Sequence, residues 1–277
     1  MNRNTLFNDG WEFAKSGLNL DFSDVNSLNF KPVDIPHDWL IYNTLDLYEN
    51  SIGWYRKTFT VESKSEHILL YFEGVYMDSS LYVNGHFAGE WKYGYSSFEH
   101  DITDFLKEGN NEIILKVVHQ SPNSRWYSGA GIYRNVWLKT RGSSYIETDG
   151  IYITARHTGN RWETEVDTEY NIKADVYISH RIIRDNKIIA SSKELVKAEK
   201  NRGVNTQRLY VENPLLWSPD EPNLYKLVTQ MELVKKDCDG NETVECIECI
   251  TQNIGFRAIN MDPDKGLILN GKKMKLN

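Results

Sequence analysis

The sequence consists mainly of short runs with strand-type patterning, separated by turn residues. Residues 68–73 form a nearly continuous apolar run that predicts a buried strand, and residues 79–83 and 112–118 read as further strands. Asn84-Gly85 favours a two-residue hairpin turn after the second of these runs. A convincing helical pattern is confined to the short stretch 101–106. The pattern therefore predicts an all-β fold.

A change in composition near residue 142 divides the chain into two predicted domains. Residues 140–144 lose apolar content and gain Gly and Ser, as is typical of a connection between domains. Beyond it, recurrent runs predict about seven strands over about 110 residues, as in an immunoglobulin-like sandwich. The first region has longer loops and more aromatic residues, which suits a jelly roll. We therefore predict a jelly-roll β-sandwich at residues 1–142 and an immunoglobulin-like β-sandwich at residues 143–258.

Residues 259–277 have a pattern of their own. Two short strand-like runs flank Asn270-Gly271, which is a second hairpin signal. The chain stops after the second arm of this hairpin without a cap or a helix. We interpret the hairpin as the entrance to a further domain.

Composition and charge exclude several classes of protein. The 277 residues exceed the length of one ordinary domain, and 40% hydrophobic with 26% charged residues excludes a disordered tail, a collagen-like fibre and a coiled coil. The net charge of −7 argues against nucleic acid and anionic membranes as partners. The longest apolar stretch, at 68–72, is far too short to span a membrane, and Met1-Asn2-Arg3-Asn4 lacks the apolar region of a signal peptide. We expect a soluble, cytoplasmic protein with a neutral ligand.

The three cysteines, Cys238, Cys246 and Cys249, are an odd number in one late segment and do not indicate a set of disulfides. Cys246-x-x-Cys249 looks like half a zinc site, but no second Cys or His pair stands at metal-ligand spacing. In a regular strand these two side chains would also point to opposite faces. We predict no metal site and no cofactor in this chain.

The chain is rich in aromatic residues, which make up 12% of it, and the loop at residues 123–134 concentrates them. Two glycines let this loop turn tightly just before a strand, while Arg125, Trp126 and Tyr127 supply donors and flat apolar faces. One interpretation is a ligand contact. The other is that the two aromatic rings cover a hydrophobic edge, while Arg125 and Arg134 pair with acidic residues.

Known catalytic motifs are absent from the sequence. It contains no nucleophile elbow, P-loop, dinucleotide fingerprint or His-Glu-x-x-His motif. Acidic residues are numerous, yet no pair is set apart by an apolar surround that would tune one of them as an acid. We therefore assign no catalytic residue to this chain.

Several motifs together resemble the glycoside hydrolases of family 2, the group of β-galactosidases, β-glucuronidases and β-mannosidases. The run Arg125-Trp-Tyr-Ser-Gly-Ala-Gly-Ile-Tyr-Arg-Asn-Val-Trp-Leu138 is similar to the signature near the end of that family's sugar-binding domain. Further segments agree in order and spacing: Asn8–Phe13, Ile35–Trp39, Glu49–Phe59, Phe72–Val75, Val83–Gly85, Gly94–Phe98, Leu216–Tyr225, Ile254–Arg257 and Leu269–Lys272.

The resemblance implies a galactose-binding-like jelly roll, an immunoglobulin-like domain, and then a catalytic (β/α)₈ barrel after residues 259–277. Such enzymes retain configuration with two Glu residues about 5–5.5 Å apart, both of which lie in the barrel. This chain alone is then expected to be inactive and to pack on its own barrel in the full-length enzyme. Any divalent or sodium ion would belong to that barrel, and homo-oligomers are compatible with the resemblance.

The resemblance also carries candidate substrate-binding residues. Asn50 matches the Asn of the family's Glu-Asn segment, which reaches the bound sugar; an amide both donates to and accepts from hydroxyl groups. Arg125 departs from the pattern, because well-known members carry an Asp there, and an Arg only donates. With Trp126 and Tyr127, these residues form the predicted binding set. The corresponding structural interpretations are a turn residue for Asn50 and an ion pair for Arg125.

The resulting hypothesis is the non-catalytic N-terminal portion of a β-galactosidase that hydrolyses terminal non-reducing β-D-galactose residues. Its relatives within the family, a β-glucuronidase or a β-mannosidase, stay open as alternatives. A second alternative is a free-standing carbohydrate-binding module that uses Trp91, Trp126 and Tyr127 as a platform. A third is a purely structural β protein of the adhesion type.

Overall fold

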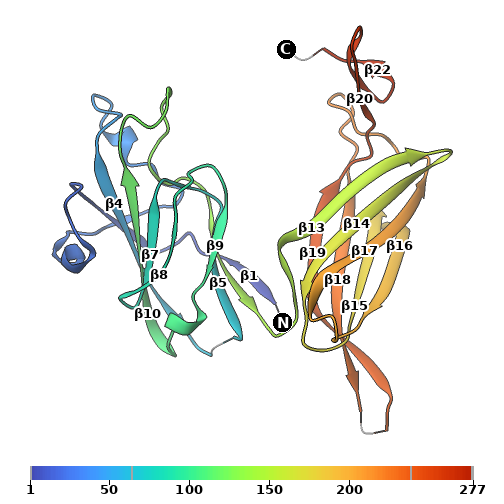
Figure 1. Cartoon of the computed structure of the whole chain (residues 1–277), viewed down its shortest axis with the longest axis horizontal. Coiled ribbons are helices and arrows are strands. Elements are labelled where there is room, and N and C mark those ends of the chain that lie inside the picture. Colours follow the sequence, from blue (N-terminus) through green and yellow to red (C-terminus); the bar gives the residue numbers. More distant parts are fainter. Residues whose placement is uncertain (1, 64, 238, 276–277) are drawn as a thin grey trace. The chain divides into compact units, whose positions relative to one another are not determined.

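The computed structural model describes residues 2–63, 65–237 and 239–275. Within this range the chain divides into two compact units, one ending at Gly142 and the other beginning at Ser143 (Figure 1). The predicted all-β fold is confirmed, because strands dominate both units. Helical structure in the described residues is limited to three short 3₁₀ turns, and no helix there is long and apolar enough to cross a membrane.

The first unit is built from twelve strands and the three 3₁₀ turns in the part of the chain that the structure describes. They are β1 (Arg3–Leu6), β2 (Trp11–Ser16), η1 (Phe22–Ser27), β3 (Lys31–Val33), η2 (Leu40–Tyr42), β4 (Ser51–Val61), β5 (His67–Phe72), β6 (Val75–Tyr76), β7 (Ser79–Val83), β8 (His86–Trp91), β9 (Phe98–Asp101), η3 (Thr103–Phe105), β10 (Gly109–His119), β11 (Gly131–Ile132) and β12 (Val136–Arg141). The helical stretch predicted at 101–106 is therefore the single turn η3, and the Asn84-Gly85 turn does join β7 to β8.

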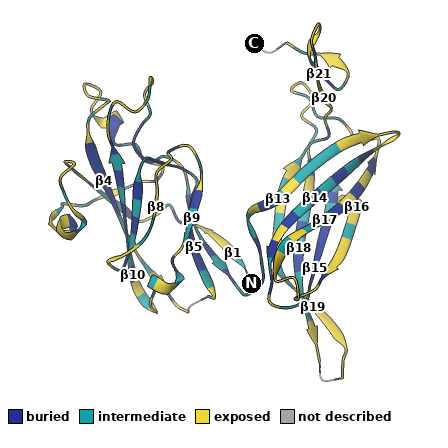
Figure 2. Ribbon diagram, in the orientation of Figure 1, coloured by how far each residue is buried: buried dark blue, intermediate teal, exposed yellow. Residues whose placement is uncertain are grey.

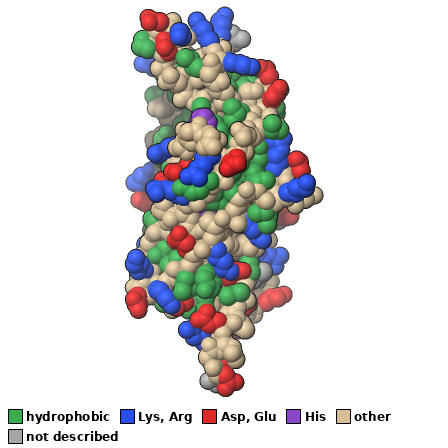
Figure 3. Space-filling model, turned by 90° about the vertical axis from the view of Figure 1, so that its right-hand side faces the viewer, with side chains coloured by type: hydrophobic (Ala, Val, Ile, Leu, Met, Phe, Trp, Pro, Cys, Tyr) green, Lys and Arg blue, Asp and Glu red, His purple; other side chains and the backbone are tan. Residues whose placement is uncertain are grey.

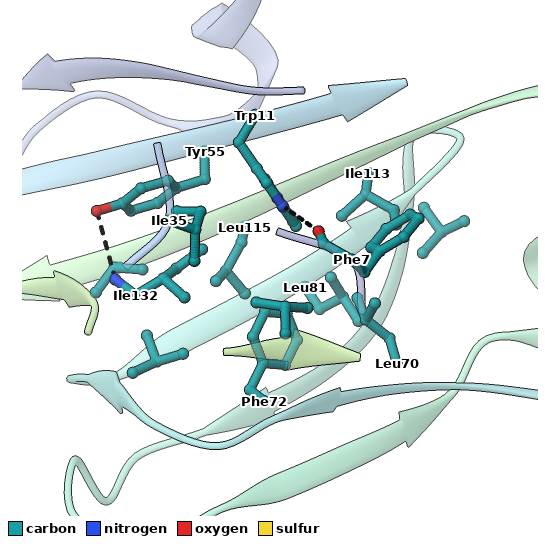
Figure 4. Packing of buried hydrophobic residues seen from close by; sticks show 14 of the residues in the cluster. Phe7, Trp11, Ile35, Tyr55, Leu70, Phe72, Leu81, Ile113, Leu115 and Ile132 are labelled. Atoms are coloured by element: carbon teal, nitrogen blue, oxygen red, sulfur yellow. Dashed lines mark hydrogen bonds between the residues drawn. The ribbon is translucent and has the colours of Figure 1, made fainter. Parts of the chain in front are cut away.

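Two antiparallel sheets form this first sandwich. One has the order β3-β2-β4-β10-β7-β8 and the other the order β1-β12-β5-β9, while β6 and β11 form a separate short pair. Alternating residues of both sheets point inward, and Tyr55, Leu115, Leu70 and Phe72 of the resulting core are fully buried (Figure 4). Trp11 is also buried in this core, and its indole N–H donates to the carbonyl of Phe7 at 2.8 Å.

The second unit contains seven strands in its sandwich, again counting the described residues: β13 (Tyr145–Thr158), β14 (Arg161–Asn171), β15 (Val176–Arg184), β16 (Lys187–Val196), β17 (Arg202–Glu212), β18 (Tyr225–Lys236) and β19 (Glu242–Ile254). They form the sheets β13-β14-β17 and β16-β15-β18-β19, with buried strand centres and exposed turns (Figure 2). Positive and negative side chains are interspersed on the surface seen in Figure 3. Among the ion pairs of this unit, Arg208 pairs with Glu163 and Glu165.

A three-stranded hairpin sheet follows the second sandwich, formed by β20 (Ile259–Asp262), β21 (Gly266–Leu269) and β22 (Lys272–Lys273). The Asn270-Gly271 turn lies between β21 and β22, as its sequence predicted. Asn270 ties this sheet to the sandwich, because its amide donates to the carbonyl of Trp217 at 2.9 Å and accepts from the backbone of Ala258 at 2.9 Å.

The expectation for Cys246 and Cys249 was wrong in one respect. A bulge interrupts the pairing of β18 with β19, since Met231 pairs with Glu248 but Glu232 pairs with Cys246. The extra residue reverses the alternation between the two cysteines, so both thiols reach the side-chain amide of Gln230, at 3.9 and 3.7 Å. Cys238 lies outside the described residues.

His180 is a fully buried polar residue in the core of the second unit. It lies on β15 between the inward-facing Ile178 and Ile182. Its ring nitrogens contact the hydroxyls of Thr168 at 3.4 Å and Thr229 at 3.0 Å, which belong to opposite sheets. Burial lowers the pKa of His180 to about 4, so the folded unit holds this imidazole neutral at ordinary pH.

Because the His180 imidazole is buried and neutral, we expect the second unit to lose stability in mild acid. Between pH 6.5 and pH 4 the unfolded chain protonates His180 while the folded unit resists, so the free energy of unfolding falls by about 3 kcal/mol. His180→Gln, which keeps a hydrogen-bonding amide, should flatten this decline. Amide hydrogen exchange of β15 and β18, measured from pH 7 to pH 4 with correction for intrinsic exchange, gives the local stability. Equal pH dependence of the two proteins would contradict the assignment.

Candidate functional site

The strand register of the first unit brings three loops to one end of its larger sheet. Ser51 at the start of β4 pairs with His119 at the end of β10. Ser79 at the start of β7 pairs with both Val117 and Trp91. The chain segments 43–50, 92–97 and 120–130 therefore leave the sheet at the same end (Figure 1). All four predicted binding residues lie on two of these segments.

The segment that follows β3 is hydrogen-bonded to the end of the 120–130 loop and to the strand after it. The backbone N–H of His37 donates to the carbonyl of Ile132 at 2.7 Å, and that of Trp39 donates to Ala130 at 3.1 Å. The His37 ring contacts the hydroxyl of Tyr55 at 2.7 Å inside the core. Burial lowers the pKa of His37, which favours a neutral, structural imidazole in this position.

Asp38 is the centre of the contact between these two segments. One carboxylate oxygen accepts hydrogen bonds from the backbone N–H groups of Leu40 at 3.0 Å and Ala130 at 2.9 Å. The other accepts from the hydroxyl of Tyr127 at 2.5 Å. Gly129 has a φ of +72°, a conformation that favours glycine, and a Cβ there would lie 2.8 Å from the Asp38 carboxylate. We call Asp38 with its three donors the Asp38 clamp.

Tyr127 is thus a member of the clamp. Its side chain is 38% exposed, but its hydroxyl is committed to Asp38. Burial, and then the neighbouring Asp38 carboxylate, raise the pKa of Tyr127 well above its ordinary value, so the phenol keeps its proton and remains a donor. The hydroxyl group fixes the loop, which leaves the ring as the part of Tyr127 that could contact a sugar.

Trp126 is more exposed than Tyr127, with 59% of its surface accessible. Its indole N–H donates to the hydroxyl of Tyr95 at 3.2 Å, which links the 120–130 loop to the 92–97 loop. Trp91 lies elsewhere on β8, where its ring stacks on Phe98 with 5.5 Å between centroids. Trp91, one of the three residues of the platform expected for a free-standing binding module, is therefore partly engaged in a contact with the core.

Arg125 is exposed at the tip of the same loop. Its guanidinium makes no ion pair with any residue in the described parts of the chain, whereas Arg134 lies over the ring of Tyr133 at 5.4 Å. The acidic partners expected in the structural interpretation are thus not found for Arg125 among these residues. Its donors are available for a ligand.

Asn50 joins the 43–50 loop to the 120–130 loop. Its side-chain oxygen accepts from the backbone N–H of Ser121 at 2.6 Å, and the amide nitrogen has no hydrogen bond to a described residue. The preceding Glu49 pairs with Lys15 at 2.8 Å and accepts from Ser51 at 3.0 Å. Burial alone would raise the pKa of Glu49, but the hydrogen bonds from Lys15 and Ser51 outweigh it and lower that pKa.

The two central carboxylates of this end of the sheet, Asp38 and Glu49, both have structural partners: Asp38 accepts three hydrogen bonds and Glu49 pairs with Lys15. The lowered pKa of Glu49 does not suit a general acid. Arg125 and Asn50 offer donors, and Trp126 offers an aromatic face. Within the described residues no group of three or more His, Cys, Asp or Glu side chains could hold a metal ion.

The sequence indicated the 120–130 loop as a candidate site, but it did not single out Asp38 and Tyr95, the partners that fix this loop. Asp38 lies in the Pro-His-Asp-Trp turn, which looked like a turn and packing element, and its partner Tyr127 is 89 positions away. Tyr95 lies in a separate Gly-Tyr segment, 31 positions before Trp126. Both residues lie in segments that resemble the family, Ile35–Trp39 and Gly94–Phe98, and that resemblance is the signal that could have marked them.

Comparison with known proteins identifies both units. The model of the sugar binding domain of glycosyl hydrolases family 2 matches residues 27–142, and a second model of that family matches residues 144–257. A β-galactosidase of Bacteroides ovatus is 33% identical over 98% of this chain, which covers 33% of the relative. A β-glucuronidase of Bacteroides fragilis is 27% identical, with 98% and 40% covered. The chain thus spans about a third of the length of such curated relatives.

A solved structure gives the same result at the level of the fold. A glycosyl hydrolase family 2 member from Bacteroides cellulosilyticus superposes with a TM-score of 0.83 at 30% identity. The match covers 99% of this chain and 38% of that one. Both predicted sandwiches therefore have a counterpart in an enzyme that extends well beyond them.

Proposed function

This chain belongs to glycosyl hydrolase family 2, and on that premise we propose that it is the non-catalytic, N-terminal portion of a retaining β-glycosidase that hydrolyses terminal non-reducing β-D-galactose residues. The two catalytic Glu residues, about 5–5.5 Å apart, then lie in a (β/α)₈ barrel outside this sequence. The first unit packs its loop end against the mouth of that barrel. The second unit and its hairpin connect to the barrel.

The observation that carries this proposal is the arrangement of Asn50, Arg125 and Trp126 at one end of the first sandwich. Three loops converge there, and the Asp38 clamp and the Asn50–Ser121 bond fix two of them. The groups left without a described partner are an amide N–H₂, a guanidinium and an aromatic face, which suit the hydroxyls and C–H surface of a neutral sugar. In the enzyme these groups bind and orient the substrate, while the barrel performs the chemistry.

Arg125 also favours a second candidate, a β-glucuronidase. A guanidinium can form two parallel hydrogen bonds with the carboxylate of a uronic acid, and Arg125 has no acidic partner among the described residues. The Bacteroides fragilis relative, which is named a β-glucuronidase, supports the same candidate.

The test compares this chain with the full-length enzyme on the nitrophenyl β-glycosides of galactose, glucuronic acid and mannose. We expect the full-length enzyme to hydrolyse the β-galactoside with the highest kcat/KM and this chain alone to hydrolyse none of them. A preference for the glucuronide would replace the first candidate by the second. Turnover by the purified chain, or inactivity of the full-length enzyme on all three, would contradict the proposal itself.

A further inference from the structure

A row of exposed aromatic side chains extends beyond the predicted binding residues. Tyr93, Tyr95 and Trp126 are 61%, 46% and 59% exposed, and we call them the aromatic rim. The rings of Tyr93 and Tyr95 lie 5.8 Å apart between centroids, and Trp126 donates to the hydroxyl of Tyr95. The rim therefore continues from the 120–130 loop onto the 92–97 loop.

The rim is built on a rigid support. Gly94 between the two tyrosines has no side chain because a Cβ would lie 2.3 Å from the ring of the buried Tyr76. The carbonyl of Gly94 accepts a hydrogen bond from the hydroxyl of Tyr133 at 2.7 Å. The ring of Tyr95 packs edge to face on Tyr76, with 5.2 Å between centroids. The ring of Tyr95 and the backbone beside it are thus held in place before any ligand arrives, which reduces the entropy lost on binding.

The chemistry of the rim suits a sugar better than an aliphatic partner. It combines flat faces, which pack against the C–H surface of a pyranose, with hydroxyl and indole groups at the ring edges that bond to sugar hydroxyls. A phenol ring is about as large as one pyranose. Three such rings in a row therefore offer more surface than a single terminal sugar can cover.

We propose that the aromatic rim is a subsite for the sugars on the leaving-group side of the cleaved bond, and that the enzyme is adapted to galactose-terminated oligosaccharides. This inference rests on the proposed function and deepens it. Asn50 and Arg125 lie at the terminal sugar, and the rim carries the chain that follows it. The competing occupant of the same surface is the catalytic barrel itself, packed against the rings.

The experiment compares two substrates in the full-length enzyme: β-galactosyl fluoride, whose leaving group is too small to reach the rim, and β-1,4-linked galactotriose. Tyr93→Ala, Tyr95→Ala and Trp126→Ala should each lower the ratio of kcat/KM for the trisaccharide to that for the fluoride, by about three- to tenfold. Tyr152→Ala is the matched control, because Tyr152 is 67% exposed on β13 of the second unit. It should leave both values unchanged.

Two results would overturn the subsite. The first is an unchanged ratio in all three variants of an active enzyme. The second is an equal loss on both substrates together with a lower thermal midpoint, which would identify the rim as a packing surface for the barrel. A wild-type enzyme that hydrolyses neither substrate would instead count against the proposed function, so the two failures are distinguishable.

Discussion

Replacing Asp38 with alanine is expected to lower kcat/KM of the full-length enzyme on its β-glycoside by about 10- to 100-fold, although Asp38 need not touch the substrate. The variant removes the acceptor of three hydrogen bonds, from Leu40, Ala130 and Tyr127. Two of these donors belong to the loop that carries Arg125 and Trp126. A loop displaced by about 1 Å misplaces both side chains relative to the reacting sugar, which raises KM and lowers kcat.

Two conservative variants separate this positioning role from a general loss of stability. Asp38→Asn keeps one oxygen for the backbone N–H groups and should retain most of the activity. Tyr127→Phe removes a single hydrogen bond and should fall between the wild type and Asp38→Ala. Steady-state kinetics and the thermal midpoint are measured on the same samples. If Asp38→Ala lowers the midpoint but leaves kcat and KM intact, the clamp serves only the fold.

Replacing Gly131 with alanine is expected to destabilise the first unit by at least about 3 kcal/mol. Gly131 has a φ of +130°, which residues with a side chain rarely adopt. A Cβ there would also lie 2.3 Å from the hydroxyl oxygen of Tyr55 and 2.5 Å from the carbonyl oxygen of His37. Both neighbours belong to the packed core or its backbone, so neither can move away cheaply.

Gly85→Ala is the matched control for this substitution. Gly85 also has a positive φ, +84°, but nothing lies within 4 Å of its missing Cβ. It should cost only about 1 kcal/mol, from backbone strain alone. Urea unfolding followed by tryptophan fluorescence reports mainly on the first unit, which contains six of the eight tryptophans. Similar losses in the two variants would show that the close contacts at Gly131 relax freely.

The parts of the fold that depend on local chemistry could be predicted from the sequence. Asn84-Gly85 and Asn270-Gly271 adopt the positive φ angles that a two-residue hairpin requires, and both turns stand where they were expected. Strand alternation gave the all-β class and about the right number of strands in the second unit. Both depend only on residues close together in the chain.

Features that depend on distant pairing could not be predicted in the same way. The bulge in β19 places Cys249 on the same face as Cys246, and no sequence pattern in that strand indicates the bulge. The Asp38 clamp joins residues 89 positions apart, and Trp126 meets Tyr95 only because β7 pairs with both β8 and β10. The resemblance to a family could supply Asn50 and Arg125 as candidates, but their hydrogen-bond partners required the three-dimensional structure.

The pairing of β1 with β12 has a consequence for the order of events during synthesis. Arg3 pairs with Thr140 and Leu6 with Trp137, so one edge of the smaller sheet is formed by residues from opposite ends of the first unit. At about 5–20 residues per second, the ribosome takes roughly 7–27 s to make the partner of β1 after β1 itself. Once β5 has been made, it lacks its neighbour β12 for the rest of this interval, so one hydrogen-bonding edge of β5 stays unpaired. The first unit is therefore expected to complete its fold only after residue 141 has left the ribosome, and a chaperone that covers β5 would be most useful before that point.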